Sequence, residues 1–507
     1  MLPKKAQLKY CVPMNKLLIL LLLLLPVSNA SAQHLEIPSD TAVTTYHEVT
    51  INKNKISYRA TTGTQPLWDE KGKAVASLFY TYYERTGVNE REKRPLVISF
   101  NGGPGSASVW MHLAYTGPRK LKIDNEGFPV QPYGVTENPH SILDIADIVY
   151  VNPVNTAYSR ILEKEESKIK RADFFGVNAD ITYLAEWLNT FVSRKNRWKS
   201  PKYLIGESYG TTRVSGLALE LQNNQWMYLN GVILVSPTEI GIERDGPVEI
   251  ANRLPYFTAA AWYHKALPEA LQQKDLEEIL PEAEQYAIDQ LLPSLAKGGA
   301  LDEKSKIKTA EKIAYYSGLT VKEVLQNNLE IPLRYFWKSL LREKGYTVGR
   351  LDSRYLGIDQ KDAGVAPDYN SELTSWLHSF TPAINYYIRE ELNFKTDAKY
   401  YMFGPVHPWD RTNNNTGAQL KQAMAQNPYL NVLIQSGYFD GATNYFDAKY
   451  TMWHLNSSGK MKNRLFFKGY RSGHMMYLRE EDLKKANEDL RVFINKTIPV
   501  DKPAKYE

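Results

Sequence analysis

The sequence that decides the fold reads YLIGESYG and occupies residues 203–210. Its first three residues form a short apolar run, and its last five match the pattern Gly-x-Ser-x-Gly. Beyond it, Val214, Leu217 and Leu221 recur at the spacing of one helix face. A strand that turns into a helix at a glycine-flanked serine holds the serine hydroxyl clear of the sheet. We therefore predict that Ser208 is a nucleophile at the end of a buried strand.

Four other short apolar runs share the character of residues 203–205. Runs that are apolar throughout fit strands of a parallel sheet that is covered on both faces. Between two of them, apolar residues recur at helical spacing from Ile181 to Phe191. This alternation predicts an α/β fold with a mostly parallel central sheet flanked by helices. The four runs are residues 96–100, 148–151, 232–235 and 431–434.

The pattern differs on either side of these runs. Residues 43–59 and 74–83 are rich in Thr, Tyr, Val and Ile, which predicts antiparallel strands. From residue 242 to 366 the strand pattern stops, and residues 320–323 read as a capping box at the start of a helix. We therefore predict a helical cap or insertion at 242–366. It interrupts a discontinuous core formed by residues 33–241 and 367–507.

The N-terminus carries the features of a secretory signal peptide. Leu17–Leu25 is an unbroken apolar run, preceded by four lysines and followed by Ala30–Ala32. The run is shorter than the roughly 20 residues that a membrane helix needs. We predict a signal peptide at residues 1–32, cleaved near Ala32, and an exported protein, periplasmic or secreted, with no stable membrane span. Cleavage also removes Cys11, the only cysteine of the chain.

Composition excludes several classes of protein. The 507 residues are 43% hydrophobic and 23% charged, as in ordinary globular proteins, so the chain as a whole is not disordered. A single cysteine excludes a disulfide framework and a cysteine-based zinc site. The formal charge of +6 is small, and no arginine-rich tract accompanies it, so we expect no nucleic-acid partner.

A serine nucleophile needs a base that is itself oriented by a carboxylate. Asp440 lies just past the apolar run at 431–434, and His474 lies in a glycine-flanked loop further along the chain. In the fold predicted here the three partners follow in the order Ser, Asp, His. His454 is the competing base, but its neighbours have a helical pattern. We predict a catalytic triad of Ser208, Asp440 and His474.

A glycine-rich loop follows another predicted strand. Residues 101–106 read NGGPGS and come directly after Phe100. Glycines there allow a backbone N–H to approach a developing oxyanion, with the N–H of Tyr209 as the second donor. A phosphate-binding loop is the alternative, but the Gly-Lys-Ser/Thr ending of that motif is missing.

Taken together, these motifs resemble the serine carboxypeptidase family, which has the α/β-hydrolase fold. The likeness runs from about Val97 to Phe493, and the cysteine-free mature chain is similar to the disulfide-free bacterial branch of the family. The resemblance implies an exopeptidase that removes one C-terminal residue from peptides or proteins through an acyl-enzyme, with no metal or cofactor. The motifs, in chain order, are NGGPG at 101–105, NP at 152–153, SPKY at 200–203, GESYG at 206–210 and GHM at 473–475.

The resemblance also implies roles for residues around the triad. Gly103 and Tyr209 would donate the N–H groups of the oxyanion hole. The terminal carboxylate of the substrate would be bound by Asn101, the Gly102 backbone and Glu207. A protonated Glu207 can donate a hydrogen bond to a carboxylate, and burial near an anion raises the pKa of an acid. An acidic working range is therefore expected.

The chain departs from the family pattern at several positions. Ser99 stands where the family has a tryptophan, and Tyr438 stands in place of an acid. Tyr115 stands where a glutamate that pairs with the Glu207 equivalent is expected. Because these changes affect carboxylate recognition and leave the triad intact, a serine esterase or acyltransferase remains an alternative. A non-catalytic binding protein on the same fold is a further alternative, against which the complete triad argues.

Overall fold

The computed structural model describes residues 37–162, 169–499 and 503–504. The predicted signal peptide and its cleavage near Ala32 lie outside these residues. Within them, no helix is both long and apolar enough to cross a membrane.

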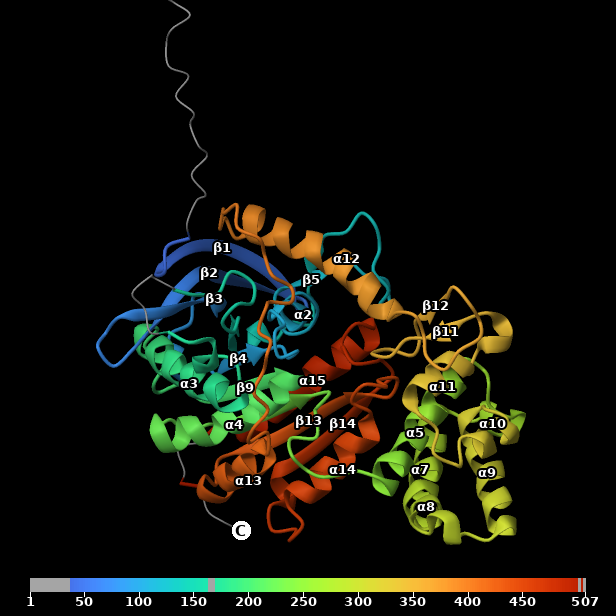
Figure 1. Ribbon diagram of the computed structural model, residues 1–507. Helices are drawn as coiled ribbons and strands as arrows, with labels where there is room; N and C mark the ends of the chain where they lie inside the picture. The colour runs from blue at the N-terminus through green and yellow to red at the C-terminus, as the bar shows by residue number, and fades with distance from the viewer. Residues whose placement is uncertain (1–36, 163–168, 500–502, 505–507) are drawn as a thin grey trace, which may run out of the picture. The chain divides into compact units, whose positions relative to one another are not determined.

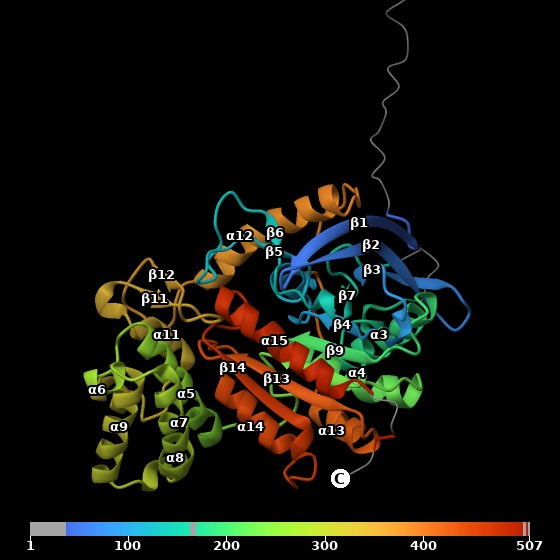
Figure 2. The same ribbon diagram turned by 180° about the vertical axis from the view of Figure 1, so that it is seen from behind.

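The described residues form one large mixed sheet of ten strands (Figures 1 and 2). Its order is β1-β2-β3-β7-β4-β9-β10-β13-β14, with β8 paired to β3. The strands from β7 to β14 run parallel, and the N-terminal strands are antiparallel, which confirms the predicted mostly parallel sheet. The strands are β1 (Thr41–Ile51), β2 (Asn54–Trp68), β3 (Ala74–Arg85), β4 (Leu96–Phe100), β7 (Asp147–Val151), β8 (Arg160–Ile161), β9 (Lys202–Glu207), β10 (Gly231–Val235), β13 (Asn431–Gly437) and β14 (Leu465–Tyr470).

The N-terminal antiparallel strands begin with a tight hairpin. Asn52 and Lys53 have φ angles of 49° and 67° and connect β1 to β2, so the predicted stretch 43–59 spans two strands. A separate two-stranded sheet joins β5 (Arg119–Leu121) to β6 (Val135–Glu137).

Helices cover both faces of the large sheet, which explains why its central strands are apolar throughout. One buried cluster joins one face of the sheet to α3 (Val177–Arg194), α4 (Tyr209–Asn224), α13 (Thr416–Gln426) and α14 (Tyr445–Leu455). A second cluster joins the opposite face to α2 (Val109–Ala114), α12 (Ser371–Tyr386) and α15 (Glu480–Thr497). Figure 2 shows α15 crossing in front of β9 and β13, on the side hidden in Figure 1.

The stretch predicted as a cap is mainly helical and has its own apolar cluster. The predicted capping box is present, because the N–H of Glu323 donates to Thr320 Oγ1 at 3.2 Å and the N–H of Thr320 donates to Glu323 Oε2 at 2.9 Å. Two short paired strands, β11 (Thr347–Val348) and β12 (Leu356–Gly357), were not predicted. The helices are α5 (Pro247–Tyr263), α6 (Glu269–Gln272), α7 (Leu276–Tyr286), α8 (Leu292–Ala296), α9 (Glu303–Ser317), α10 (Val321–Gln326) and α11 (Leu333–Ser339).

Candidate active site

Ser208 occupies a sharp turn between β9 and α4. Its φ of 57° lies in the left-handed region that non-glycine residues rarely adopt, and its N–H donates to the carbonyl of Val235 at 3.0 Å. The flanking glycines make the turn possible: a Cβ at Gly206 would lie 2.2 Å from the Gly210 carbonyl oxygen, and one at Gly210 would lie 2.8 Å from that of Phe100. The backbone therefore fixes the serine at the end of the sheet, as predicted from the motif.

Asp440 and His474 meet in a loop cluster beyond β13 and β14. His474 Nδ1 donates to Asp440 Oδ2 at 2.6 Å. The same carboxylate oxygen accepts the Thr443 hydroxyl at 2.7 Å, and Oδ1 accepts the N–H groups of Ala442 and Thr443 at 2.8 and 3.1 Å. These bonds fix the orientation of the carboxylate and hence of the imidazole, whose Nε2 is left as the proton acceptor.

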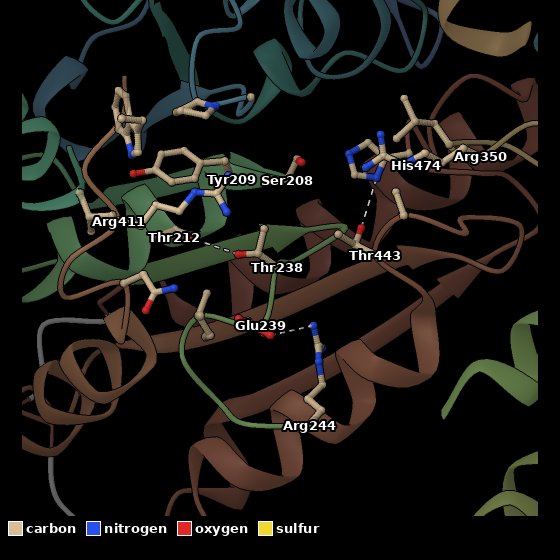
Figure 3. Close-up of a pocket in the computed structure, with 18 residues that line it drawn as sticks. Ser208, Tyr209, Thr212, Thr238, Glu239, Arg244, Arg350, Arg411, Thr443 and His474 are labelled. Atoms are coloured by element: carbon tan, nitrogen blue, oxygen red, sulfur yellow. Dashed lines mark hydrogen bonds and ion pairs between the residues drawn. The ribbon is translucent and has the colours of Figure 1, made fainter. Parts of the chain in front are cut away.

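The pKa of His474 is raised above its usual 6.5. Burial is the largest single effect and lowers this pKa, but the charge of Asp440, its hydrogen bond to the imidazole and the charge of Glu207 together outweigh burial. Ser208 and His474 line the same two pockets, and Figure 3 shows both side chains at the larger one. The structure therefore pairs His474 with Asp440 and places His474 and Ser208 on the walls of the same two pockets, while their action as a triad stays a prediction.

The glycine loop at 101–106 packs directly on the turn that carries Ser208. A Cβ at Gly102 would lie 2.5 Å from the nitrogen of Tyr209 and 2.6 Å from the carbonyl oxygen of Glu207, so only glycine permits this approach. Gly103 has a φ of 105° and lines the pocket beside Ser208. Tyr209 is the first residue of α4, a position whose N–H has no partner within the helix. Both predicted oxyanion donors therefore lie beside the serine.

The residues predicted to bind a carboxylate form a buried hydrogen-bonded group. Asn101 Nδ2 donates to Glu207 Oε1 at 2.9 Å, and the Tyr477 hydroxyl donates to Glu207 Oε2. Glu207 is only 4% exposed, and burial raises its pKa to about 7. The Asn101 amide is oriented by the N–H of Met111, which donates to its Oδ1 at 3.2 Å. The group thus contains an acid that is readily protonated near neutral pH.

Tyr477 contacts Glu207 although no sequence motif predicts this pair. Tyr115, at the position where the resemblance expects a glutamate, donates its hydroxyl to Gln435 Oε1 at 2.6 Å. Its ring stacks on that of Tyr477, with centroids 4.7 Å apart and planes 7° apart. The partner of Glu207 therefore comes from the segment after His474, three residues beyond the predicted base, where no motif marks it.

Two pockets flank Ser208 and His474. The first, about 360 Å³ in volume, contains several charged side chains, and we call it the arginine-lined pocket; Figure 3 shows it. The second, about 220 Å³, we call the aromatic pocket; it also contains Gly102 and Glu207. The arginine-lined pocket is lined by Tyr209, Thr212, Glu239, Arg244, Arg350 and Arg411, among others. The aromatic pocket is lined by Trp110, Leu373, Trp376, Phe403 and Met475, among others.

Residues 349–354, which we call the strap, lie within the stretch predicted as a cap and form hydrogen bonds with the loops of Asp440 and His474. The carbonyl of Leu351 accepts the N–H of His474 at 2.6 Å, and the carbonyl of Arg350 accepts the N–H of Gly441 at 3.0 Å. On the other side, Glu372 Oε1 accepts the N–H of Leu351 at 2.9 Å. Arg350 and Leu351 also line both pockets. No motif in the sequence marks this segment.

Within the part of the chain that the structure describes, no group of three His, Cys, Asp or Glu side chains could hold a metal ion. His454, the competing base, lies in α14, and its Nδ1 contacts the carbonyl of Tyr450 at 2.9 Å, as its helical surroundings predicted.

Comparison with known proteins identifies relatives in sequence and in structure. Serine carboxypeptidase-like 36 of Arabidopsis thaliana is 28% identical over 167 residues, which is 32% of this chain and 32% of that protein. Vitellogenic carboxypeptidase of Aedes aegypti is 27% identical over 151 residues, 30% of this chain and 29% of that protein. The matched part thus spans about a third of the length of these relatives.

A solved structure has the same fold. The prohormone-processing carboxypeptidase Kex1(delta)p of Saccharomyces cerevisiae matches with a TM-score of 0.53 and 16% identity, over 88% of this chain and 93% of that chain. This match confirms the α/β-hydrolase fold.

The family model described as serine carboxypeptidase matches residues 67–483, which is most of the sequence. It spans the glycine loop, the turn at Ser208 and the loops of Asp440 and His474. The chain therefore belongs to the serine carboxypeptidase family.

Proposed function

We propose that this chain is an exported serine-type carboxypeptidase that removes single residues from the C-termini of peptides or proteins. The observation that carries the proposal is the position of Glu207. This buried acid, with a pKa of about 7, lies next to Ser208 in the chain and lines the aromatic pocket together with it. A protonatable acid beside the nucleophile suits an enzyme whose substrate ends in a carboxylate.

The chemistry follows from the geometry of the three predicted triad residues. Ser208 attacks the carbonyl of the last peptide bond while His474 Nε2 takes its proton, and Asp440 stabilises the imidazolium through Nδ1. The N–H groups of Gly103 and Tyr209 bind the oxyanion of the tetrahedral intermediate. His474 then gives its proton to the leaving amine, and water attacks the acyl-enzyme by the same steps in reverse.

Recognition of the terminal carboxylate falls to Glu207, Asn101 and the N–H of Gly102. The protonated Glu207 donates a hydrogen bond to the substrate, and the approaching anion raises its pKa further. Tyr477 replaces the second carboxyl group that the family resemblance leads one to expect. Burial raises the pKa of Tyr477 well above 10, so its hydroxyl stays a donor to Glu207 across the working range.

The test compares one peptide as the free acid and as the C-terminal amide, with products followed by mass spectrometry. We expect loss of one residue from the acid, little loss from the amide, and neither with Ser208→Ala. Equal trimming of both forms would contradict carboxylate recognition. Cleavage of a simple ester without any trimming of peptides would instead favour the esterase or acyltransferase alternative.

We also propose that residues 1–32 direct export to the periplasm or medium and are removed. The support is the lysine-rich start, the short apolar run and the small residues at 30–32. N-terminal sequencing of the protein from the exported fraction should begin at Gln33. A protein retained inside the cell with residues 1–32 intact would contradict the proposal.

A further inference from the structure

The two pockets receive different parts of a peptide if the proposed function holds, and the inference here rests on it. The aromatic pocket contains Gly102 and Glu207, so it takes the C-terminal residue that leaves. The arginine-lined pocket lies beyond Ser208 on the side of Tyr209 and Thr212, away from Glu207. It therefore takes the side chain of the penultimate residue, which becomes the acyl group.

The charges of the arginine-lined pocket are unbalanced. Three arginines line it against one acid, Glu239. The positive charge of Arg244 is balanced by two carboxylates, because its guanidinium lies 4.0 Å from Glu239 Oε2 and 3.8 Å from Asp447 Oδ1. Arg350 and Arg411 form no ion pair with any residue in the described ranges. Among the described residues, Arg350 and Arg411 therefore face the pocket without a carboxylate at ion-pair distance, and only the charge of Arg350 reaches another acid, Glu372, which lines neither pocket.

The three arginines come from separate parts of the fold. Arg244 lies between β10 and α5, Arg350 belongs to the strap, and Arg411 precedes α13. In Figure 3 their side chains approach from different sides, with Arg244 reaching up to Glu239 from below. A side chain that enters the pocket therefore meets arginine side chains from three parts of the fold.

Guanidinium groups in this arrangement recognise carboxylates. Their planar N–H forks match a carboxylate geometrically, and the bonds are strengthened by the opposite charges. A lysine or arginine side chain would be repelled, and an apolar one would take water from the arginines without replacing it. We propose that the arginine-lined pocket selects peptides with an acidic penultimate residue, through Arg350 and Arg411.

The test uses three N-blocked dipeptides that end in phenylalanine, with glutamate, glutamine or lysine before it. We expect kcat/KM to fall in that order at a pH near neutrality, with glutamate about tenfold above glutamine. The ratio of glutamate to glutamine should also fall as salt approaches about 1 M, where charge interactions are screened beyond about 3 Å. These measurements need only the wild-type protein.

Single substitutions test which arginines are responsible for the preference for glutamate. Arg411→Gln and Arg350→Gln should each lower the glutamate-to-glutamine ratio severalfold. Glu239→Gln should raise it, because it removes the one acid that lines the pocket. Arg389→Gln is the matched control: its exposed guanidinium lies 3.9 Å from Asp397 and lines neither pocket, so the ratio should not change.

Equal kcat/KM for the glutamate and glutamine peptides, or a ratio that neither arginine variant lowers, would overturn the inference. Failure of the proposed function gives a different result, because no phenylalanine would then be released from any of the three dipeptides.

Discussion

Replacing Glu207 with glutamine is expected to abolish the fall of kcat/KM at alkaline pH with peptide substrates. Burial raises the pKa of Glu207 to about 7. The carboxyl is then roughly nine-tenths protonated at about pH 6 and one-tenth protonated at about pH 8. Since only the protonated form donates to the substrate's carboxylate, wild-type kcat/KM should fall about tenfold over that interval. A glutamine amide donates at every pH, so the variant should lose this fall.

The same change should move the acid limb of the profile to lower pH. Burial lowers the pKa of His474, but the charges of Asp440 and then Glu207 raise it above 6.5. Glutamine carries no charge, so the protonated imidazole loses one stabilising neighbour and its pKa falls. The neutral base then persists at lower pH, and the profile widens on both sides. Because the charges of Glu207 and His474 shift each other's pKa, the two pKa values read from the wild-type profile describe the coupled pair and not either residue alone.

The assay follows release of phenylalanine from a blocked dipeptide from about pH 5 to about pH 9. Glu372→Gln is the matched control, because burial raises the pKa of Glu372 to about 7 as well, yet its side chain lines neither pocket. That variant should keep the alkaline limb, and an ester substrate without a free carboxylate should show no such limb even with the wild type. An unchanged alkaline limb in Glu207→Gln, or its loss in Glu372→Gln instead, would refute the reasoning.

Three further predictions concern the residues around Glu207 and the serine. Ser208→Ala should lower kcat by roughly 10⁴-fold or more while the circular dichroism spectrum stays unchanged, and residual turnover near the wild-type rate would exclude Ser208 as nucleophile. Tyr477→Phe removes a hydrogen bond that lowers the pKa of Glu207, so the alkaline limb should move to higher pH; a shift to lower pH would contradict this. Gly102→Ala places a Cβ 2.5 Å from the Tyr209 nitrogen, so it should lower the melting temperature, at a cost of about 1–3 kcal/mol, and reduce activity; a variant as stable and active as the wild type would show that the loop can move away.

The sequence predicted the features that depend on local chain geometry. The turn at Ser208 needs glycines at two nearby positions, and the loop before Gly103 needs glycine where it meets that turn, so short motifs reveal both. The parallel sheet was predictable because strands buried on both faces are apolar throughout. Asp440 and His474 could be chosen because each follows one of these strands.

Other parts of the site depend on contacts between segments that are distant in the sequence, and such contacts produce no local sequence motif. Tyr477 contacts Glu207, the last residue of β9, across 270 residues of sequence, and Tyr115 donates to Gln435 instead. The strap binds the neighbouring loops through backbone groups, which every residue type supplies. Its amino-acid sequence therefore does not reveal these contacts. Strands β11 and β12 are two residues each, too short for an alternation of side chains to appear.

The strap also sets limits on how this protein can be re-engineered. Its carbonyl groups hold the loops of His474 and Asp440 in register, while Arg350 and Leu351 line both pockets. A chimera that exchanges the helical insertion with that of a relative should therefore keep residues 349–354 with the host sheet. Cutting the chain before residue 349 would exchange the helices and, of the two pocket linings, only Arg244, whereas cutting after 354 would also replace Arg350, Leu351 and the backbone groups that hold the loops of Asp440 and His474.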